Sequence, residues 1–284
     1  MDAKLRAKYE KLKSFIREKG GDGAIVAFSG GVDSSTLAAV CLEILGDRVA
    51  AVTAKSATYP CEELDEAKKV AKEIGVKHCI VETNELSNED FLRNPENRCY
   101  YCKSELLDVF KDSAARLGFR VIFEGTNYSD LSGHRPGFKA VKEREYVLSP
   151  WVEAKFKKED IRQLARELGL SVHDRPASPC LASRIPFGQR ITEERLRRVE
   201  AAEKAIREIV EVKELRVRDH DGLARIEVGR NERDLLFDAK IMDRIAEQLE
   251  KLGFKFVTMD MAGYKTGSML KLVEKQTHDS RHLT

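Results

Sequence analysis

The stretch Ala24-Ile-Val-Ala-Phe-Ser-Gly-Gly-Val-Asp-Ser-Ser35 decides the fold of this 284-residue chain. Its apolar residues 24–28 predict a short buried strand, and the apolar pattern of residues 36–45 predicts a helix soon afterwards. Between them, two glycines let the backbone approach an anion, while serine hydroxyls and the helix N-terminus supply hydrogen-bond donors. We therefore predict a strand, loop and helix that bind phosphate.

The loop residues that we assign to a nucleotide site are Ser29, Gly30, Gly31, Asp33, Ser34 and Ser35. Asp33 is the candidate to help hold Mg²⁺ on the phosphates of ATP. The chain has neither the Gly-Lys-Ser/Thr ending of a Walker loop nor a G-x-G-x-x-G motif, which argues against those two kinds of nucleotide site. The alternative is an ordinary strand-to-helix turn capped by Asp33.

Outward from this loop, strand and helix patterns alternate. Strands are expected at residues 49–53, 78–81 and 120–123, and helices at residues 62–74 and 103–117. Such alternation predicts crossover connections and a doubly wound α/β fold with a parallel sheet.

Two further segments are expected at the carboxyl edge of this sheet, where open α/β sheets bind ligands. Gly125 and Thr126, in Glu124-Gly-Thr-Asn127, follow the third of these strands and are assigned to the nucleotide side. Ala54, after the strand 49–53, is assigned to the wall around adenine. A plain Gly-Asn turn is the alternative for the first segment.

The remainder of the chain changes character twice. Residues 135–190 contain five of the seven prolines and one helix pattern, 158–168, and such long irregular stretches are usually functional. After residue 192, a helix, two strands, a helix and a strand predict a smaller α+β domain. We therefore expect domains at residues 1–188 and 189–284.

Composition limits the partners and the compartment. Fifty Lys and Arg against forty-eight Asp and Glu leave a net charge of +2, which gives no reason to expect a nucleic-acid partner. No apolar run approaches the roughly 18 residues of a membrane span, and the polar N-terminus lacks a signal core. We expect a cytoplasmic protein whose six cysteines are thiols or metal ligands.

Three of these cysteines are candidate metal ligands. Cys99 and Cys102 form a C-x-x-C pair before the predicted helix 103–117, and the helix N-terminus favours their thiolate form. Cys180 is the remaining credible thiol. Three ligands are too few for a closed zinc site, whereas a [4Fe-4S] cluster held by three cysteines leaves one iron open. Inert thiols or a structural zinc site are the alternatives.

Taken together, the motifs resemble the LarE family of ATP-dependent sulfur transferases, within the PP-loop ATP pyrophosphatases. They are the loop Ser29–Ser35, Asn97-Arg-Cys-Tyr-Tyr-Cys-Lys103, Glu124-Gly-Thr-Asn127, His134-Arg-Pro-Gly137 and Ser178-Pro-Cys-Leu-Ala-Ser-Arg-Ile-Pro186. The resemblance runs through nearly the whole chain. It implies that ATP adenylates the carboxylates of pyridinium-3,5-biscarboxylic acid mononucleotide, which become thiocarboxylates for the nickel-pincer cofactor.

The resemblance also implies roles for single residues. Cys180 matches a cysteine that one subtype of the family sacrifices for its sulfur, whereas Cys99 and Cys102 match a second subtype, in which three cysteines hold [4Fe-4S] and the open iron carries sulfide. Arg184 is a candidate to neutralise a substrate phosphate or carboxylate. Arg216 is the arginine expected at the substrate in the second domain. A sulfide donor and a homo-oligomer, a hexamer built from trimers, are further implications.

Three rival interpretations stay open. A tRNA-thiolating enzyme would share the loop and a cluster, but it would need a basic surface for phosphate contacts. An amide-forming ligase such as NAD synthetase would have no use for three such cysteines. A zinc-binding or nucleotide-sensing module would lack turnover altogether.

Overall fold

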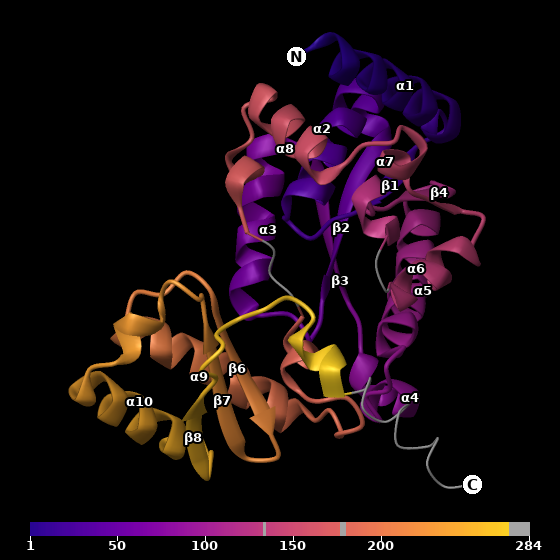
Figure 1. The fold of residues 1–284 in the computed structure, drawn as a ribbon. Helices are drawn as coiled ribbons and strands as arrows, with labels where there is room; N and C mark the ends of the chain where they lie inside the picture. The colour runs from indigo at the N-terminus through magenta and orange to yellow at the C-terminus, as the bar shows by residue number, and fades with distance from the viewer. Residues whose placement is uncertain (133–134, 177–179, 273–284) are drawn as a thin grey trace, which may run out of the picture. The chain divides into compact units, whose positions relative to one another are not determined.

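The computed structural model describes residues 1–132, 135–176 and 180–272. The chain divides into two compact units, one made of Met1–Glu85 with Asn97–Ser178 and the other of Leu86–Glu96 with Pro179–Thr284 (Figure 1). The predicted boundary between residues 188 and 189 falls later in the chain than this division and remains a proposal.

The first unit is built on a five-stranded parallel sheet in the order β3-β2-β1-β4-β5. Its strands are β1 (Ala24–Ala27), β2 (Val49–Lys55), β3 (Lys77–Glu82), β4 (Val121–Phe123) and β5 (Val147–Leu148). Alternate side chains enter two different apolar clusters, as Ala24 and Val26 do on one face and Ile25 on the other. The predicted doubly wound α/β fold is confirmed.

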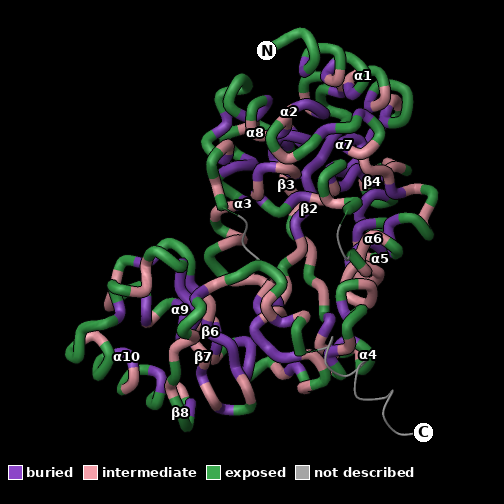
Figure 2. The backbone as a smooth tube through the Cα atoms, viewed as in Figure 1, coloured by how far each residue is buried: buried purple, intermediate pink, exposed green. Residues whose placement is uncertain are grey.

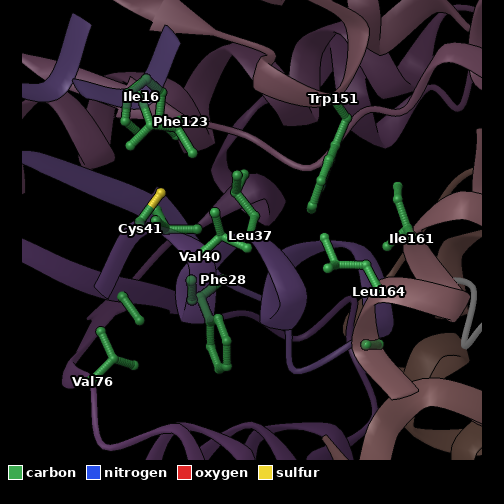
Figure 3. Packing of buried hydrophobic residues seen from close by; sticks show 14 of the residues in the cluster. Ile16, Phe28, Leu37, Val40, Cys41, Val76, Phe123, Trp151, Ile161 and Leu164 are labelled. Atoms are coloured by element: carbon green, nitrogen blue, oxygen red, sulfur yellow. The ribbon is translucent and has the colours of Figure 1, made fainter. Parts of the chain in front are cut away.

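Helices cover both faces of this sheet (Figure 1). On one face lie α1 (Ala3–Gly20), α2 (Val32–Leu45), α3 (Cys61–Ile74), α7 (Pro150–Glu153) and α8 (Lys158–Glu167), and on the other lie α5 (Arg98–Arg116) and α6 (Pro136–Lys142). Figure 3 shows part of the first cluster, in which Leu37 and Val40 of α2 lie near Phe28. The strands at the centre of the unit are accordingly buried (Figure 2).

The region between residues 135 and 190 is more regular than predicted. It contains α6, β5 and α7 as well as the expected α8. Pro136 and Pro150 each stand at the start of a short helix, where the missing N–H of proline costs no helical hydrogen bond. Elements of two to seven residues are too short to show a periodic apolar pattern, and for this reason the sequence analysis missed them.

The second unit contains a small mixed sheet, β6-β7-β8, with β6 (Leu215–His220) antiparallel and β8 (Phe256–Met259) parallel to β7 (Leu223–Val228). Its helices are α4 (Glu89–Leu92), α9 (Glu193–Ile209) and α10 (Ala239–Lys251). The predicted smaller α+β part is confirmed. Helix α10 begins at Ala239, because Asp238 accepts a hydrogen bond from the N–H of Ile241 and thereby caps the helix.

One strand face of this sheet is polar. Arg216, Arg218, Arg225 and Glu227 alternate with apolar residues that are buried on the opposite side. We call this surface the polar face, and it carries one of the predicted site residues.

Asn94 joins the segment before α5 to the rest of the second unit. It is completely buried, and its Nδ2 donates to the carbonyl oxygens of Ile185 at 3.2 Å, Pro186 at 2.8 Å and Gln189 at 3.1 Å. Its own carbonyl accepts the N–H of Gly188 at 2.9 Å. These bonds explain why residues 86–96 belong to the second unit.

Among the described residues, no helix is both long enough and apolar enough to cross a membrane.

Candidate functional site

The loops after β1 and β4 lie next to each other at the edge of the sheet. Strand β1 stands between β2 and β4, so the direction of strand order reverses there, and ligands of open α/β sheets bind at such a point. A Cβ atom built on Gly125 would lie 3.4 Å from the Cβ of Asp33. Asn127 donates from Nδ2 to Oδ1 of Asp33 at 3.4 Å. The structure therefore brings together two segments that the sequence analysis assigned to one nucleotide site.

The loop after β1 is braced by its own serines. Ser34 Oγ accepts the N–H of Ser29 at 3.1 Å, and Ser29 Oγ accepts the N–H of Gly31 at 3.3 Å. Gly30 has a φ of +73°, and a Cβ atom there would lie 2.8 Å from the Cα of Ala67 on α3. Only glycine fits this position without a shift of the backbone.

The start of α2 fits an anion. Its N-cap is Gly31, which supplies no side-chain hydrogen bond to the first turn, so the positive end of the helix dipole faces the loop without a capping oxygen. The Oγ of Ser35 is buried and has no hydrogen-bond partner among the residues that the structure describes. Such an unpaired group costs about 1–3 kcal/mol, which favours a ligand that brings an acceptor oxygen.

Asp33 is held by residues that the sequence analysis did not assign. Its carboxylate pairs with Nζ of Lys158 at 2.5 Å, and its carbonyl accepts the indole N–H of Trp151 at 3.1 Å. A magnesium ion on Asp33 would therefore exchange places with the Lys158 ammonium. No sequence signal points to Lys158, because it lies 125 residues from Asp33.

Glu124 organises the second loop. It is only 2% exposed, and it accepts hydrogen bonds from the hydroxyls of Thr126, at 2.8 Å, and of Ser149. The Nζ of Lys103 lies 3.5 Å from its Oε2. The Thr126 hydroxyl thus braces Glu124, and the unassigned Lys103 connects the C-x-x-C helix to this loop.

Ala54 lies near the end of β2, half-buried, beside a polar contact between strands. The hydroxyl of its neighbour Thr53 donates to the carbonyl of Phe28 at 2.8 Å, and it therefore accepts from Nε2 of His78, 2.7 Å away. Burial, followed by the charge of Lys68, lowers the pKa of His78. The neutral imidazole is favoured at this edge.

The C-x-x-C pair was predicted to lie before a helix. In the structure it lies inside one. Helix α5 begins at Arg98, so Cys99 and Cys102 are both helical, with Cys99 exposed and Cys102 half-buried. The Cys102 thiol is 3.9 Å from Oε1 of the buried Glu85. The polar start of α5 does not show the apolar periodicity from which the helix was predicted.

Cys180 belongs to the second unit, where it is half-buried and precedes a single turn, Leu181–Arg184. Within the described parts of the chain, no three His, Cys, Asp or Glu side chains converge on a metal site. His134 and the residues before Cys180 in its motif, 178 and 179, lie outside the described residues. The three-cysteine cluster therefore stays a prediction.

Arg184 forms a buried ion pair. Its side chain is 2% exposed, with Nε 2.8 Å and Nη2 3.0 Å from the two carboxylate oxygens of Glu203. Nη1 donates to the carbonyl of Cys180 at 3.2 Å. The pair therefore fixes the turn that begins at Cys180, which the sequence analysis did not foresee because Glu203 comes from α9.

Arg216 lies on the polar face and, unlike Arg184, forms no ion pair with a carboxylate among the described residues. Its Nε is buried and has no hydrogen-bond partner among residues 1–132, 135–176 and 180–272, while Nη1 donates to the carbonyl of Leu215 at 2.6 Å. Its neighbour Arg218 is paired with Glu227 at 2.6 Å, but no carboxylate pairs with Arg216 among the described residues. Burial, followed by the charge of Arg184, lowers the pKa of Arg216. An incoming anion would satisfy this cation.

Comparison with known proteins agrees with this geometry. Residues 4–96 match a family model described as NAD synthase. Over 247 residues, covering 86% of this chain and 87% of the relative, the chain is 37% identical to pyridinium-3,5-bisthiocarboxylic acid mononucleotide synthase of Lactiplantibacillus plantarum. It is 40% identical over 271 residues to an uncharacterized protein of Synechocystis, and the match covers 95% of this chain and 100% of that protein. It is also 29% identical over 219 residues to the GMP synthase of Aeropyrum pernix, covering 71% of this chain and 42% of that protein.

Proposed function

Because the chain belongs to the PP-loop ATP pyrophosphatases, in the family of pyridinium-3,5-bisthiocarboxylic acid mononucleotide synthase, we propose that it is an ATP-dependent sulfur transferase. Its substrate is pyridinium-3,5-biscarboxylic acid mononucleotide, and its products are the thiocarboxylate, pyrophosphate and AMP. The observation that carries the proposal is the loop at the reversal of strand order, in which the buried Ser35 hydroxyl has no hydrogen-bond partner in the described parts of the chain.

In the first half-reaction, a substrate carboxylate attacks the α-phosphorus of ATP, and pyrophosphate leaves. The backbone N–H groups of the loop and the N-terminus of α2 bind the departing pyrophosphate. Asp33 would help to hold Mg²⁺, which would neutralise phosphate charge, and Lys158, now paired with Asp33, would then bind a phosphate oxygen. A carboxylate is a poor electrophile, so adenylation supplies the leaving group that sulfur later displaces.

In the second half-reaction, an anionic sulfur attacks the acyl adenylate, a carbon–sulfur bond forms, and AMP leaves. We propose that Cys99, Cys102 and Cys180 hold a [4Fe-4S] cluster, which would supply sulfide on its fourth iron. The C-x-x-C pair and the exposure of Cys99 support this ligand set. The alternative is direct donation of the Cys180 sulfur, which would leave dehydroalanine at residue 180.

The substrate phosphate is proposed to bind in the second unit. Arg216 supports this role because its side chain is half-buried, its buried Nε has no hydrogen-bond partner among the described residues, and no carboxylate there pairs with it. Arg184 acts there as a positioning residue, since its bonds to Glu203 and to the Cys180 carbonyl hold the turn after the sulfur donor.

Two measurements test these proposals separately. Pyrophosphate release from ATP should depend on the pyridinium biscarboxylate, and mass spectrometry should detect the thiocarboxylate; release without any substrate dependence would refute the transferase. Iron and acid-labile sulfide, measured after anaerobic purification, should reach about four of each per chain and fall in Cys99→Ala. An iron-free wild-type chain whose intact mass falls by one hydrogen sulfide, lost at Cys180 during turnover, would instead establish the sacrificial route.

A further inference from the structure

A segment after β8 returns across the polar face of the small sheet. We call residues 260–270 the strap. Arg225 fastens it at two points, because its Nη1 pairs with Asp260 Oδ2 at 2.6 Å and its Nη2 donates to the Met269 sulfur at 3.3 Å. One side chain of the sheet therefore holds both ends of the strap.

Between these two points, Tyr264 lies on Arg216. The guanidinium carbon is 5.0 Å from the centre of the Tyr264 ring, and the Tyr264 side chain remains half-buried. The N–H of Tyr264 donates to the carbonyl of Val228 at 2.7 Å. Gly263 has a φ of +70°, and a Cβ atom there would lie 2.9 Å from the same carbonyl oxygen. The backbone thus fixes where the tyrosine ring stands.

The Arg216 guanidinium consequently offers two different surfaces. Its face is covered by the Tyr264 ring, whereas its buried Nε, on the edge, has no hydrogen-bond partner within the described part of the chain. A phosphate binds a guanidinium at its edge, through the N–H groups. In a mononucleotide the phosphate and the base are attached to one ribose, so a phosphate anchored at Arg216 brings the base within reach of Tyr264.

Resting on the proposed function, we infer that Tyr264 is a specificity-determining residue that recognises the pyridinium ring of the substrate through the face of its ring opposite Arg216. The ring of this substrate is a permanent cation, and a tyrosine face attracts a cation more strongly than it attracts a neutral ring. Arg216 selects for a phosphate, which every mononucleotide has. Tyr264 then selects for the charged base.

The test compares two probes in the full-length chain by calorimetric titration. Nicotinic acid mononucleotide carries the phosphate and a pyridinium cation, whereas ribose 5-phosphate carries the phosphate alone. Tyr264→Ala should weaken binding of the first probe roughly three- to thirtyfold, and it should leave binding of the second within about twofold. Tyr264→Phe keeps the π face and should retain the affinity for both probes.

Phe256→Ala is the matched control, since Phe256 is a 65%-exposed aromatic residue of β8 in the same unit, and its removal should change neither affinity. If Tyr264→Ala does not fold, Tyr264→Leu against Tyr264→Phe makes the same comparison with the volume retained. Equal losses for both probes would show that the ring only supports Arg216 and would overturn the inference alone. A wild-type chain that binds neither probe, or an Arg216→Ala variant that binds both normally, would refute the proposed phosphate site and the inference with it.

Discussion

Replacing Gly30 by alanine tests two requirements of the nucleotide loop, a left-handed backbone at this residue and a close approach to α3. A left-handed backbone costs about 1–2 kcal/mol in a residue that has a Cβ atom. At Gly30, where φ is +73°, the added atom would also lie 2.8 Å from the Cα of Ala67, and relieving such an overlap costs typically 1–3 kcal/mol. We therefore expect Gly30→Ala to lower the free energy of unfolding by about 2–5 kcal/mol.

Gly169 provides the matched control. Its φ is +72°, and a Cβ atom there would meet nothing within 4 Å. Gly169→Ala should therefore lower the free energy of unfolding only by the cost of the left-handed backbone, about 1–2 kcal/mol. Urea denaturation measures both values, and titration with ATP in the presence of Mg²⁺ measures whether the loop still binds. Gly30→Ala should also lose nucleotide affinity, because the loop must move away from α3. Equal stability of the two variants together with unchanged ATP affinity of Gly30→Ala would refute this reasoning.

Three further predictions concern charged groups. Lys158→Met should raise the KM for ATP about tenfold while changing the unfolding free energy by no more than about 1 kcal/mol, since its pair with Asp33 is partly exposed; steady-state kinetics and denaturation would show this. Glu203→Gln should lower the unfolding free energy by about 3–5 kcal/mol in urea denaturation, because it leaves Arg184 buried without its counter-charge. The pKa of His78 is lowered in the folded state, so the stability that it contributes is present above the ordinary histidine pKa and is lost as the pH falls through the folded value. His78→Gln should therefore lose less stability than the wild type between about pH 7 and pH 5, as Tm measurements would show.

The nucleotide loop could be predicted from sequence because everything that defines it is contiguous. Strand, glycines, hydroxyls and helix follow one another within residues 24–45, and each acts through local backbone geometry. The alternation of longer strands and helices was predictable for the same reason. Strand β5 was not, because two residues contain no period and its pairing with β4 is a tertiary contact.

The partners of the site residues escaped prediction for a different reason. Lys158 reaches Asp33 across 125 residues, and Glu203 reaches Arg184 from another helix, so neither pairing leaves a local pattern. Arg216 was predicted to lie at the substrate only through the resemblance to a known family. Among the described residues Arg216 lacks a carboxylate partner, whereas Arg218 pairs with Glu227. This difference depends on how the strands of the small sheet pair and on which segment covers the sheet.

The buried contacts of Asn94 have a consequence for how this protein can be divided or inherited. The chain passes between the two units three times, after residues 85, 96 and 178, so neither unit is a single continuous piece of the gene. A fragment that starts at residue 179 would leave three backbone carbonyls without the amide of Asn94. Neither a simple truncation nor a one-point recombination with a distant relative can exchange the second unit intact. A functional chimera would have to carry residues 86–96 along with the carboxyl-terminal part, which ties the two units to a common evolutionary history.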